Sequence, residues 1–161
     1  MTAPPDPDPI LRNELLQRAA ALKLHGLIAH WDTLPEAEWP WVQRLIEWEE
    51  VERKRRGLER RLSAAHIGRF KPLADFDWNW PGQCDKTAVS GFMTLRFIKE
   101  TANIILVGPN GVGKSMIAQN IAHHAVMQGH SALFVTAAQM LGDLTAQDGD
   151  NALRRRLKYY A

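Results

Sequence analysis

The clearest chemistry in the sequence lies in one segment, from Gly108 to Ser115, which reads GPNGVGKS. It matches the pattern G-x-x-x-x-G-K-[ST] at every fixed position. Glycines let such a loop curl without side-chain clashes, so that successive backbone N–H groups converge on one anion, and the following helix adds its positive end. The segment therefore predicts a site that binds phosphate groups.

The two residues that close this segment indicate what carries the phosphates. Lys114 is expected to place its ammonium near a β- and a γ-phosphate, and the Ser115 hydroxyl to complete the coordination of Mg²⁺. The predicted ligand is a nucleoside triphosphate, ATP with Mg²⁺. The predicted nucleotide-binding residues are Gly108, Pro109, Asn110, Gly111, Val112, Gly113, Lys114, Ser115 and Met116, with Ser115 as the metal ligand.

The elements on either side of the loop are those that such a site needs. Before it, Asn103 to Val107 (NIILV) is a short apolar run that predicts a strand buried on both faces of a parallel sheet. After it, Lys114 to Gln128 has helical periodicity and is closed by Gly129. This strand, loop and helix disfavour the alternative interpretation, a chance glycine-rich turn.

Further elements follow on both sides of this unit. Ser131 to Val135 (SALFV) predicts a second buried strand, and Thr136 with Gln139 fits a capping box that begins another helix. Helices are also expected over Ser90 to Glu100 and over Asn151 to Ala161. The C-terminal part of the chain is therefore predicted to alternate strands and helices.

Two predicted strands are too few for a parallel sheet, which needs neighbours on its edges and helices on both faces. In such folds an acidic residue at the end of another apolar strand helps to hold the metal or to prepare the attacking water. After Ser115 the acidic residues are Asp143, Asp148 and Asp150, and none follows a run of four strand-forming residues. We therefore expect a P-loop domain of three α/β/α layers over residues 67–161, incomplete at its C-terminus, with little or no ATP hydrolysis.

The first part of the chain is predicted to be helical. Residues 1–9, rich in Pro and Asp, are expected to form a disordered tail, and a helix to run from about Ile10 to Ala29. A long helix should begin at Pro40, since proline suits a first helical turn. Its apolar residues are spaced by three, four or seven: Trp41, Leu45, Trp48, Val51, Leu58, Leu62 and Ala65. Residues 10–66 are thus predicted as an N-terminal helical region, joined to the next domain by a loop over 68–88.

The tryptophans have two possible uses. All six could stack on nucleic-acid bases: Trp31, Trp39, Trp41, Trp48, Trp78 and Trp80. The favoured interpretation is that those near the long helix pack the N-terminal helices together, because large aromatic side chains dominate small cores.

A basic cluster also lies on the long helix, with six positive charges against the single Glu59. Such a cluster could neutralise the phosphates of duplex DNA without reading bases. The alternative is a solvated helix face, because Glu47, Glu49, Glu50 and Glu52 are close enough to pair with it at i,i+3 and i,i+4. The candidate DNA-binding residues are Arg53, Lys54, Arg55, Arg56, Arg60 and Arg61.

Composition excludes several other classes of protein. The chain has 161 residues, 45% of them hydrophobic and 24% charged, with a net charge of +2, which is a weak argument for polyanion binding as a whole. No apolar run approaches the roughly 18 residues of a membrane span, and the N-terminus lacks the zones of a secretory signal. The single Cys84 cannot form an internal disulfide. We expect a cytoplasmic protein with no membrane partner.

From Ile67 to Ala161 the sequence resembles the IstB-like ATP-binding proteins that assist transposases of insertion sequences, relatives of the bacterial helicase loader DnaC. Four stretches carry the resemblance: IGRFKPLADFDW from Ile67, NIILVGPNGVGKS from Asn103, IAHHAVMQGHSALFVTAAQML from Ile121, and the terminal RRRLKYYA. LKLHGL from Leu22 and ERKRRGLERRLSAAHI extend the resemblance over nearly the whole chain.

The resemblance implies an AAA+ ATPase that assembles into oligomers on DNA and passes a nucleotide-dependent signal to a transposase. It places part of an adenine pocket at Phe70 to Trp78. The acidic strand, polar sensor and oligomer-facing arginine of the family have no matching positions here. The expected function is an ATP-binding helper of a transposase, with a DnaC-like helicase loader or a non-hydrolysing nucleotide- or partner-binding module as alternatives.

Overall fold

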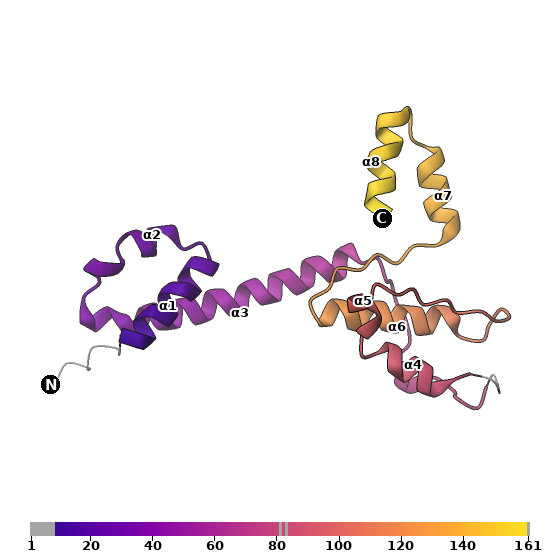
Figure 1. Cartoon of the computed structure of the whole chain (residues 1–161), viewed down its shortest axis with the longest axis horizontal. Helices are drawn as coiled ribbons and strands as arrows, with labels where there is room; N and C mark the ends of the chain where they lie inside the picture. The colour runs from indigo at the N-terminus through magenta and orange to yellow at the C-terminus, as the bar shows by residue number, and fades with distance from the viewer. Residues whose placement is uncertain (1–8, 81, 83, 161) are drawn as a thin grey trace. The chain divides into compact units, whose positions relative to one another are not determined.

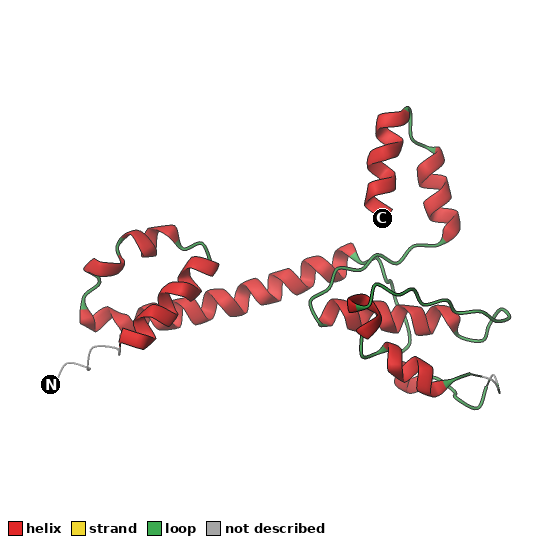
Figure 2. Ribbon diagram, viewed as in Figure 1, coloured by secondary structure: helices red, strands yellow, loops and turns green. Residues whose placement is uncertain are grey.

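The computed structural model describes residues 9–80, 82 and 84–160. The chain divides into two compact units, one through Gly57 and the other from Leu58 onward. Figure 1 labels the helices, and Figure 2 shows helices and loops but no strand in the described part of the chain. Residues 1–8 of the expected tail lie outside the described residues, and the predicted domain bounds remain predictions.

The first unit begins with two helices where the sequence predicted one. Helix α1 spans Pro9–Ala21 and α2 spans His25–Ala29. The break occurs because Lys23 adopts the left-handed conformation, with φ of 54°, and the N–H of Leu24 then bonds the carbonyl of Ala19 at 3.0 Å. This bond closes the helix in the manner of a Schellman cap, although glycine is the usual residue there.

Helix α3 spans Trp39–Ala64, so the predicted long helix is confirmed, but the predicted packing face is wrong in this unit. The residues that α3 buries are Trp39, Val42 and Ile46, which pack with Leu15 and Ala19 of α1. They lie on the side of the helix opposite to the predicted Trp41 and Trp48 stripe. Both arrangements have helical spacing, and only contact with α1 decides between them.

The four tryptophans near α3 likewise fall into a packed pair and an exposed pair. Trp31, in the short 3₁₀ helix Trp31–Thr33, meets Trp39 edge to face with ring centroids 5.0 Å apart, so the packing role is confirmed for this pair. It is wrong for Trp41 and Trp48, which are 52% and 60% exposed. A second 3₁₀ helix, Glu36–Glu38, leads into α3.

The second unit contains the helices that surround the candidate site. They are α4 (Lys86–Phe92), α5 (Arg96–Lys99) and α6 (Lys114–Met127), with a 3₁₀ helix at Leu73–Asp75. The single helix predicted over Ser90 to Glu100 is wrong, because Leu95 has a left-handed φ of 58° that separates α4 from α5. Helix α6 ends as predicted, before Gly129 with φ of 97°.

Two further helices form a hairpin near the C-terminus, α7 (Ala137–Thr145) and α8 (Asp150–Tyr160), visible in Figure 1. The capping box predicted for Thr136 and Gln139 is confirmed. Asp143 of α7 accepts a 2.7 Å hydrogen bond from the hydroxyl of Tyr160 and pairs with Arg156, both on α8. These two partners lower the pKa of Asp143, so this carboxylate stays ionised and joins the two helices.

The two predicted strands are extended segments without strand pairing. Among the described residues no backbone hydrogen bond joins 103–107 to 131–135, and the one bond from the second segment runs from the N–H of Phe134 to the carbonyl of Ala65 at 2.8 Å. Ile104 and Leu106 pack on the core around α6, whereas Ile105 and Val107 are 82% and 89% exposed. The strand prediction is not confirmed in the described residues, because a ladder needs a neighbouring strand, which an apolar run does not itself provide.

Candidate nucleotide-binding site

The loop before α6 has the backbone of an anion site. Gly111 and Gly113 have positive φ angles of 83° and 92°, and the N–H of Ile117 makes the first helical bond to the carbonyl of Gly113 at 3.0 Å. For the N–H groups from Gly111 to Met116, the described residues provide no acceptor. These donors lie at the positive end of α6, where an anion binds most favourably.

Lys114 and Ser115 present their polar groups at this end of the helix. The Lys114 ammonium donates hydrogen bonds to the carbonyls of Gly108 and Pro109, at 2.8 and 2.5 Å, and so folds back over the loop. Ser115 is exposed. A phosphate could replace the two carbonyls as the partner of the ammonium, and the Ser115 hydroxyl is open to a cation such as Mg²⁺.

A buried aromatic side chain packs against the last glycine of the loop. Phe76 is only 7% exposed, and a Cβ atom added to Gly113 would lie 2.5 Å from its Cε2 atom. The ring also packs at 4.7 Å from Trp78, which carries the ammonium of Lys86 over its face at 5.4 Å. Phe76 therefore fixes the last glycine of the loop at the point where α6 begins.

A buried asparagine holds the segment that carries Phe76. Asn120 of α6 is 8% exposed and accepts a 2.9 Å hydrogen bond from the N–H of Leu73. Its amide nitrogen donates to the carbonyls of Lys71 and Met116 at 2.9 and 2.8 Å. Gln119 adds a 2.9 Å bond to the carbonyl of Ile67. Residues 67–76 are thus fastened to the helix that begins at the phosphate loop.

Replacing Asn120 with alanine is expected to lower the free energy of unfolding by about 2 kcal/mol, because the part-buried N–H of Leu73 and carbonyl of Lys71 lose their hydrogen-bond partner. Urea unfolding followed by circular dichroism measures this change. Asn151→Ala, at an exposed position of α8, is the matched control and should stay within about 0.5 kcal/mol of the parent. Equal stability of both variants would contradict the role assigned to Asn120.

Some of the predicted site residues lie at the loop, and others pack in the core away from it. Gly108 to Ser115 lie together, while the side chain of Met116 packs in the core, so that only its backbone faces the site. Phe70 packs with the other core cluster, 5.2 Å from His123. A cavity of about 530 Å³ opens beside Lys114, and residues from α4 rather than from 70–78 line it. The adenine pocket at Phe70 to Trp78 stays a prediction.

Sequence reasoning missed Asn120, Gln119 and the support of Gly113 by Phe76. One signal was present, since Asn120 interrupts the apolar face formed by Ile117 and Ile121 of α6. A polar residue on a buried helix face is kept when its hydrogen bonds are satisfied. The partners of Asn120 are backbone groups of a loop, which no sequence pattern identifies.

The basic cluster on α3 is partly neutralised by its own helix. Arg53 pairs with Glu49 at 3.0 Å, and Arg55 and Arg56 both pair with Glu52 at 2.7 Å. Hydrogen bonds from Arg55 and Arg56 lower the pKa of Glu52 to about 2. Lys54 and Arg60 are exposed and have no ion pair with any described residue.

The six residues also do not share one face. At about 3.6 residues per turn, Arg53, Arg56 and Arg60 follow one side of α3, and Lys54 and Arg61 follow another. The Nε atom of Arg61 is buried and has no hydrogen-bond partner among the described residues. The cluster therefore surrounds the helix rather than forming a single stripe.

One family model and several curated proteins match this chain. The family model "IstB-like ATP binding protein" matches residues 17–161. Similar proteins are the ATP-binding proteins assigned to insertion sequence IS5376 of Geobacillus stearothermophilus, 28% identical over 73% of this chain and 47% of the relative, and to IS21 of Pseudomonas aeruginosa, 34% identical over 66% and 40%.

A third relative, an ATP-binding protein assigned to an insertion sequence of Mycobacterium tuberculosis, is 29% identical over 95% of this chain and 62% of its own length. The chain thus spans about half the length of the curated relatives that it matches. Because the family model covers most of the chain, including the phosphate loop, the chain belongs to the IstB-like ATP-binding protein family.

Proposed function

We propose that this chain binds Mg-ATP through Gly108 to Met116 and acts as the ATP-binding helper of a transposase. The observation that carries the binding proposal is the row of N–H groups from Gly111 to Met116, which have no acceptor in the described part of the chain. Lys114 and Ser115 lie at the same end of α6 and supply the cationic and hydroxyl groups that a magnesium nucleotide needs. The helper role is supported by relatives assigned to insertion sequences.

The fold proposed for the second unit is the AAA+-like α/β/α arrangement expected from the sequence. Its support is the alternation of the 103–107 segment, where Ile104 and Leu106 face the core and Ile105 and Val107 face outward. An apolar segment with both faces adapted to packing is typical of a central strand in a parallel sheet. No described residue forms that sheet, so its layers remain part of the proposal.

Binding is proposed without hydrolysis. Asp143 is engaged by Tyr160 and Arg156, and Asp85 caps α4 by accepting a hydrogen bond from the N–H of Ala88 at 2.9 Å. Both carboxylates thus already take part in contacts within the described chain. A nucleotide-binding module that does not turn over ATP is therefore the second candidate, and a helicase-loader role differs only in the protein that receives the signal.

Calorimetric titration of the chain with Mg-ATP tests the binding proposal directly. We expect a saturable heat signal that depends on Mg²⁺, and inorganic phosphate should compete because it uses the same N–H groups. The absence of any signal at millimolar nucleotide would overturn the proposal. Identifying the proteins that co-purify with the intact chain then distinguishes the two roles. A transposase would support the helper role, and a replicative helicase would support the loader role.

We also propose that α3 contacts the phosphates of DNA, mainly through Lys54 and Arg60, which are exposed and form no ion pair with a described carboxylate. Changing both residues to glutamine is expected to reduce the slope of log affinity against log salt concentration by roughly 2, because each lost phosphate contact removes about 0.9. Fluorescence anisotropy with a labelled duplex at several salt concentrations measures this slope.

The matched control for this prediction is Lys23→Gln with Lys99→Gln, which removes the same charge away from the basic cluster. An equal change in slope from both pairs would show that only net charge matters, and the α3 contact would be rejected. Binding that is unaffected by either pair would also reject it.

A further inference from the structure

Helices α7 and α8 depend on each other rather than on the core of the second unit. The structure describes every residue of both helices, and none of them is buried. The hydrophobic core clusters of the described residues include no side chain from either helix. Helix α6, by contrast, buries Ile117, Ile121 and Val126. The hairpin of α7 and α8 therefore lacks the apolar packing that holds α6 in place.

Neither helix of the hairpin is long enough to be stable by itself. Helix α7 has 9 residues and α8 has 11. Isolated helices shorter than about 12–15 residues are marginal in water. Helix α8 also carries Arg154 and Lys158 four residues apart, a like-charge pair that weakens a helix. Contacts between the two helices must therefore supply the missing stability.

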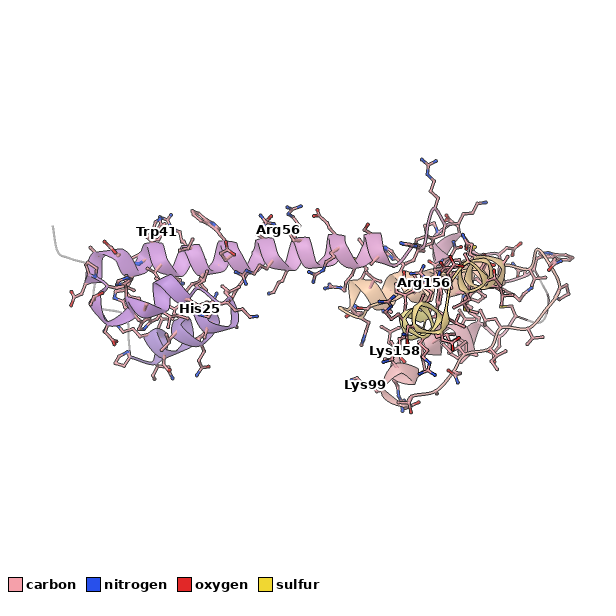
Figure 3. The ribbon with its side chains drawn as sticks, turned by 90° about the horizontal axis from the view of Figure 1, so that it is seen from above. His25, Trp41, Arg56, Lys99, Arg156 and Lys158 are labelled. Atoms are coloured by element: carbon pink, nitrogen blue, oxygen red, sulfur yellow. The ribbon has the colours of Figure 1, made fainter. Side chains whose placement is uncertain are left out.

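In the described part of the chain, the side-chain hydrogen bonds that join α7 to α8 all end on one carboxylate. Asp143 accepts a 2.7 Å hydrogen bond from the hydroxyl of Tyr160 and pairs with Arg156, whose guanidinium also lies 4.4 Å from the centre of the Tyr159 ring. Figure 3, in which both helices are seen nearly end on, shows Arg156 toward α7 and Lys158 on the other side of α8. We call Asp143, Arg156 and Tyr160 the hairpin latch.

The hairpin borders a cavity and not a packed surface. The three latch residues line this space together with Ile67 and Phe134, and its volume is about 430 Å³. Phe134 anchors the segment before the hairpin, because its side chain packs with a core cluster and its N–H bonds the carbonyl of Ala65 at 2.8 Å. The chain is thus anchored at Phe134 and takes no part in the described core clusters from Thr136 onward.

We propose that the α7–α8 hairpin opens and closes as a unit of its own, with its hinge at Val135 and Thr136 and with Asp143 as the contact that keeps it closed. Opening frees the Asp143 carboxylate and makes Ile67 and Phe134 accessible from the cavity. Local opening of this kind occurs where few apolar contacts hold a segment. It uses neither the phosphate loop nor a nucleotide, so it stands independently of the proposed ATP binding.

Hydrogen exchange of the full chain, followed by mass spectrometry, tests the separate opening. We expect the amides of α7 and α8 to exchange about a hundredfold faster than those of α6, because only α6 is held by buried apolar side chains. They should still exchange more slowly than an unstructured peptide, because the latch closes the hairpin. Equal rates in the three helices would show one cooperative unit, and a hairpin without any protection would have no closed state. Either result would overturn the proposal.

Asp143→Asn tests the latch, because asparagine keeps the size of the side chain and removes the charge that Arg156 and Tyr160 contact. Exchange in α7 and α8 should become about tenfold faster, while exchange in α6 stays unchanged. Asp148→Asn is the matched control, since Asp148 is exposed between the two helices and forms no ion pair with a described residue. Equal effects of the two substitutions, or equal acceleration in α6, would reject Asp143 as the latch.

Ionic strength gives a second measurement on the unchanged chain. The side chains of Arg156 and Asp143 are 36% and 29% exposed, so dissolved salt screens their attraction. Raising the salt concentration from about 0.05 M to about 1 M should speed exchange in α7 and α8 several-fold relative to α6, and should have little effect in Asp143→Asn. A parent chain whose hairpin does not respond to salt, or a variant that responds as strongly as the parent, would show that this ion pair does not hold the hairpin closed.

Discussion

Lys114→Ala is expected to weaken the binding of Mg-ATP by about a hundredfold, because charge-assisted hydrogen bonds contribute about 1.5–3 kcal/mol and the proposed phosphate site lies at the end of α6 that begins with Lys114. In the structure this ammonium already donates to two loop carbonyls, Gly108 and Pro109. Neutral carbonyls are weaker partners than phosphate oxygens, so the exchange favours the nucleotide. Calorimetric titration of parent and variant under the same Mg²⁺ concentration measures the difference.

Two controls make this result specific to the loop. Lys99→Ala removes a positive charge from α5 and should leave affinity for the nucleotide unchanged. Urea unfolding should show that Lys114→Ala keeps the stability of the parent, because the side chain lies at the exposed loop and not in the core. Unchanged affinity in Lys114→Ala would mean that the nucleotide, if bound, does not use this loop.

The phosphate loop could be predicted from the sequence because its chemistry is local. The two glycines with positive φ, the lysine and the serine all lie within Gly108 to Ser115, and α6 follows at Lys114 as predicted. The same holds for the capping box at Thr136, which depends on residues three apart. Short-range features of this kind require no knowledge of the rest of the fold.

Features that depend on distant neighbours could not be predicted in this way. The 103–107 segment has the composition of a strand, yet strand pairing depends on another segment lying beside it. On α3 the sequence contains two apolar faces, and contact with Leu15 and Ala19 selects the face with Val42 and Ile46. Asn120 likewise gains its role only when residues 67–76 fold onto α6.

Gly113→Ala is expected to be the most disruptive single change in the loop. Its φ of 92° lies in the left-handed region, where a side chain costs about 1–2 kcal/mol, and the new methyl would lie 2.5 Å from a Phe76 carbon, a clash that costs about 1–3 kcal/mol more. The free energy of unfolding should fall by the sum of these terms, and Mg-ATP binding should be lost with the loop geometry. Urea unfolding and calorimetric titration measure the two effects.

Substitutions at other glycines of the chain separate the conformational cost of a positive φ from the clash with Phe76. Gly111 has a φ of 83° with nothing within 4 Å of an added Cβ, so Gly111→Ala should show the conformational cost alone. Gly142, inside α7, is equally open and has no positive φ, and its replacement should be neutral or stabilising by up to about 1 kcal/mol. If Gly113→Ala proves no worse than Gly111→Ala, Phe76 does not constrain the loop. If Gly113→Ala is clearly more destabilising, residues 67–76, which Asn120 holds by hydrogen bonds, determine the position of the first turn of α6. They then also determine the position of the N–H groups on which the proposed nucleotide binding depends.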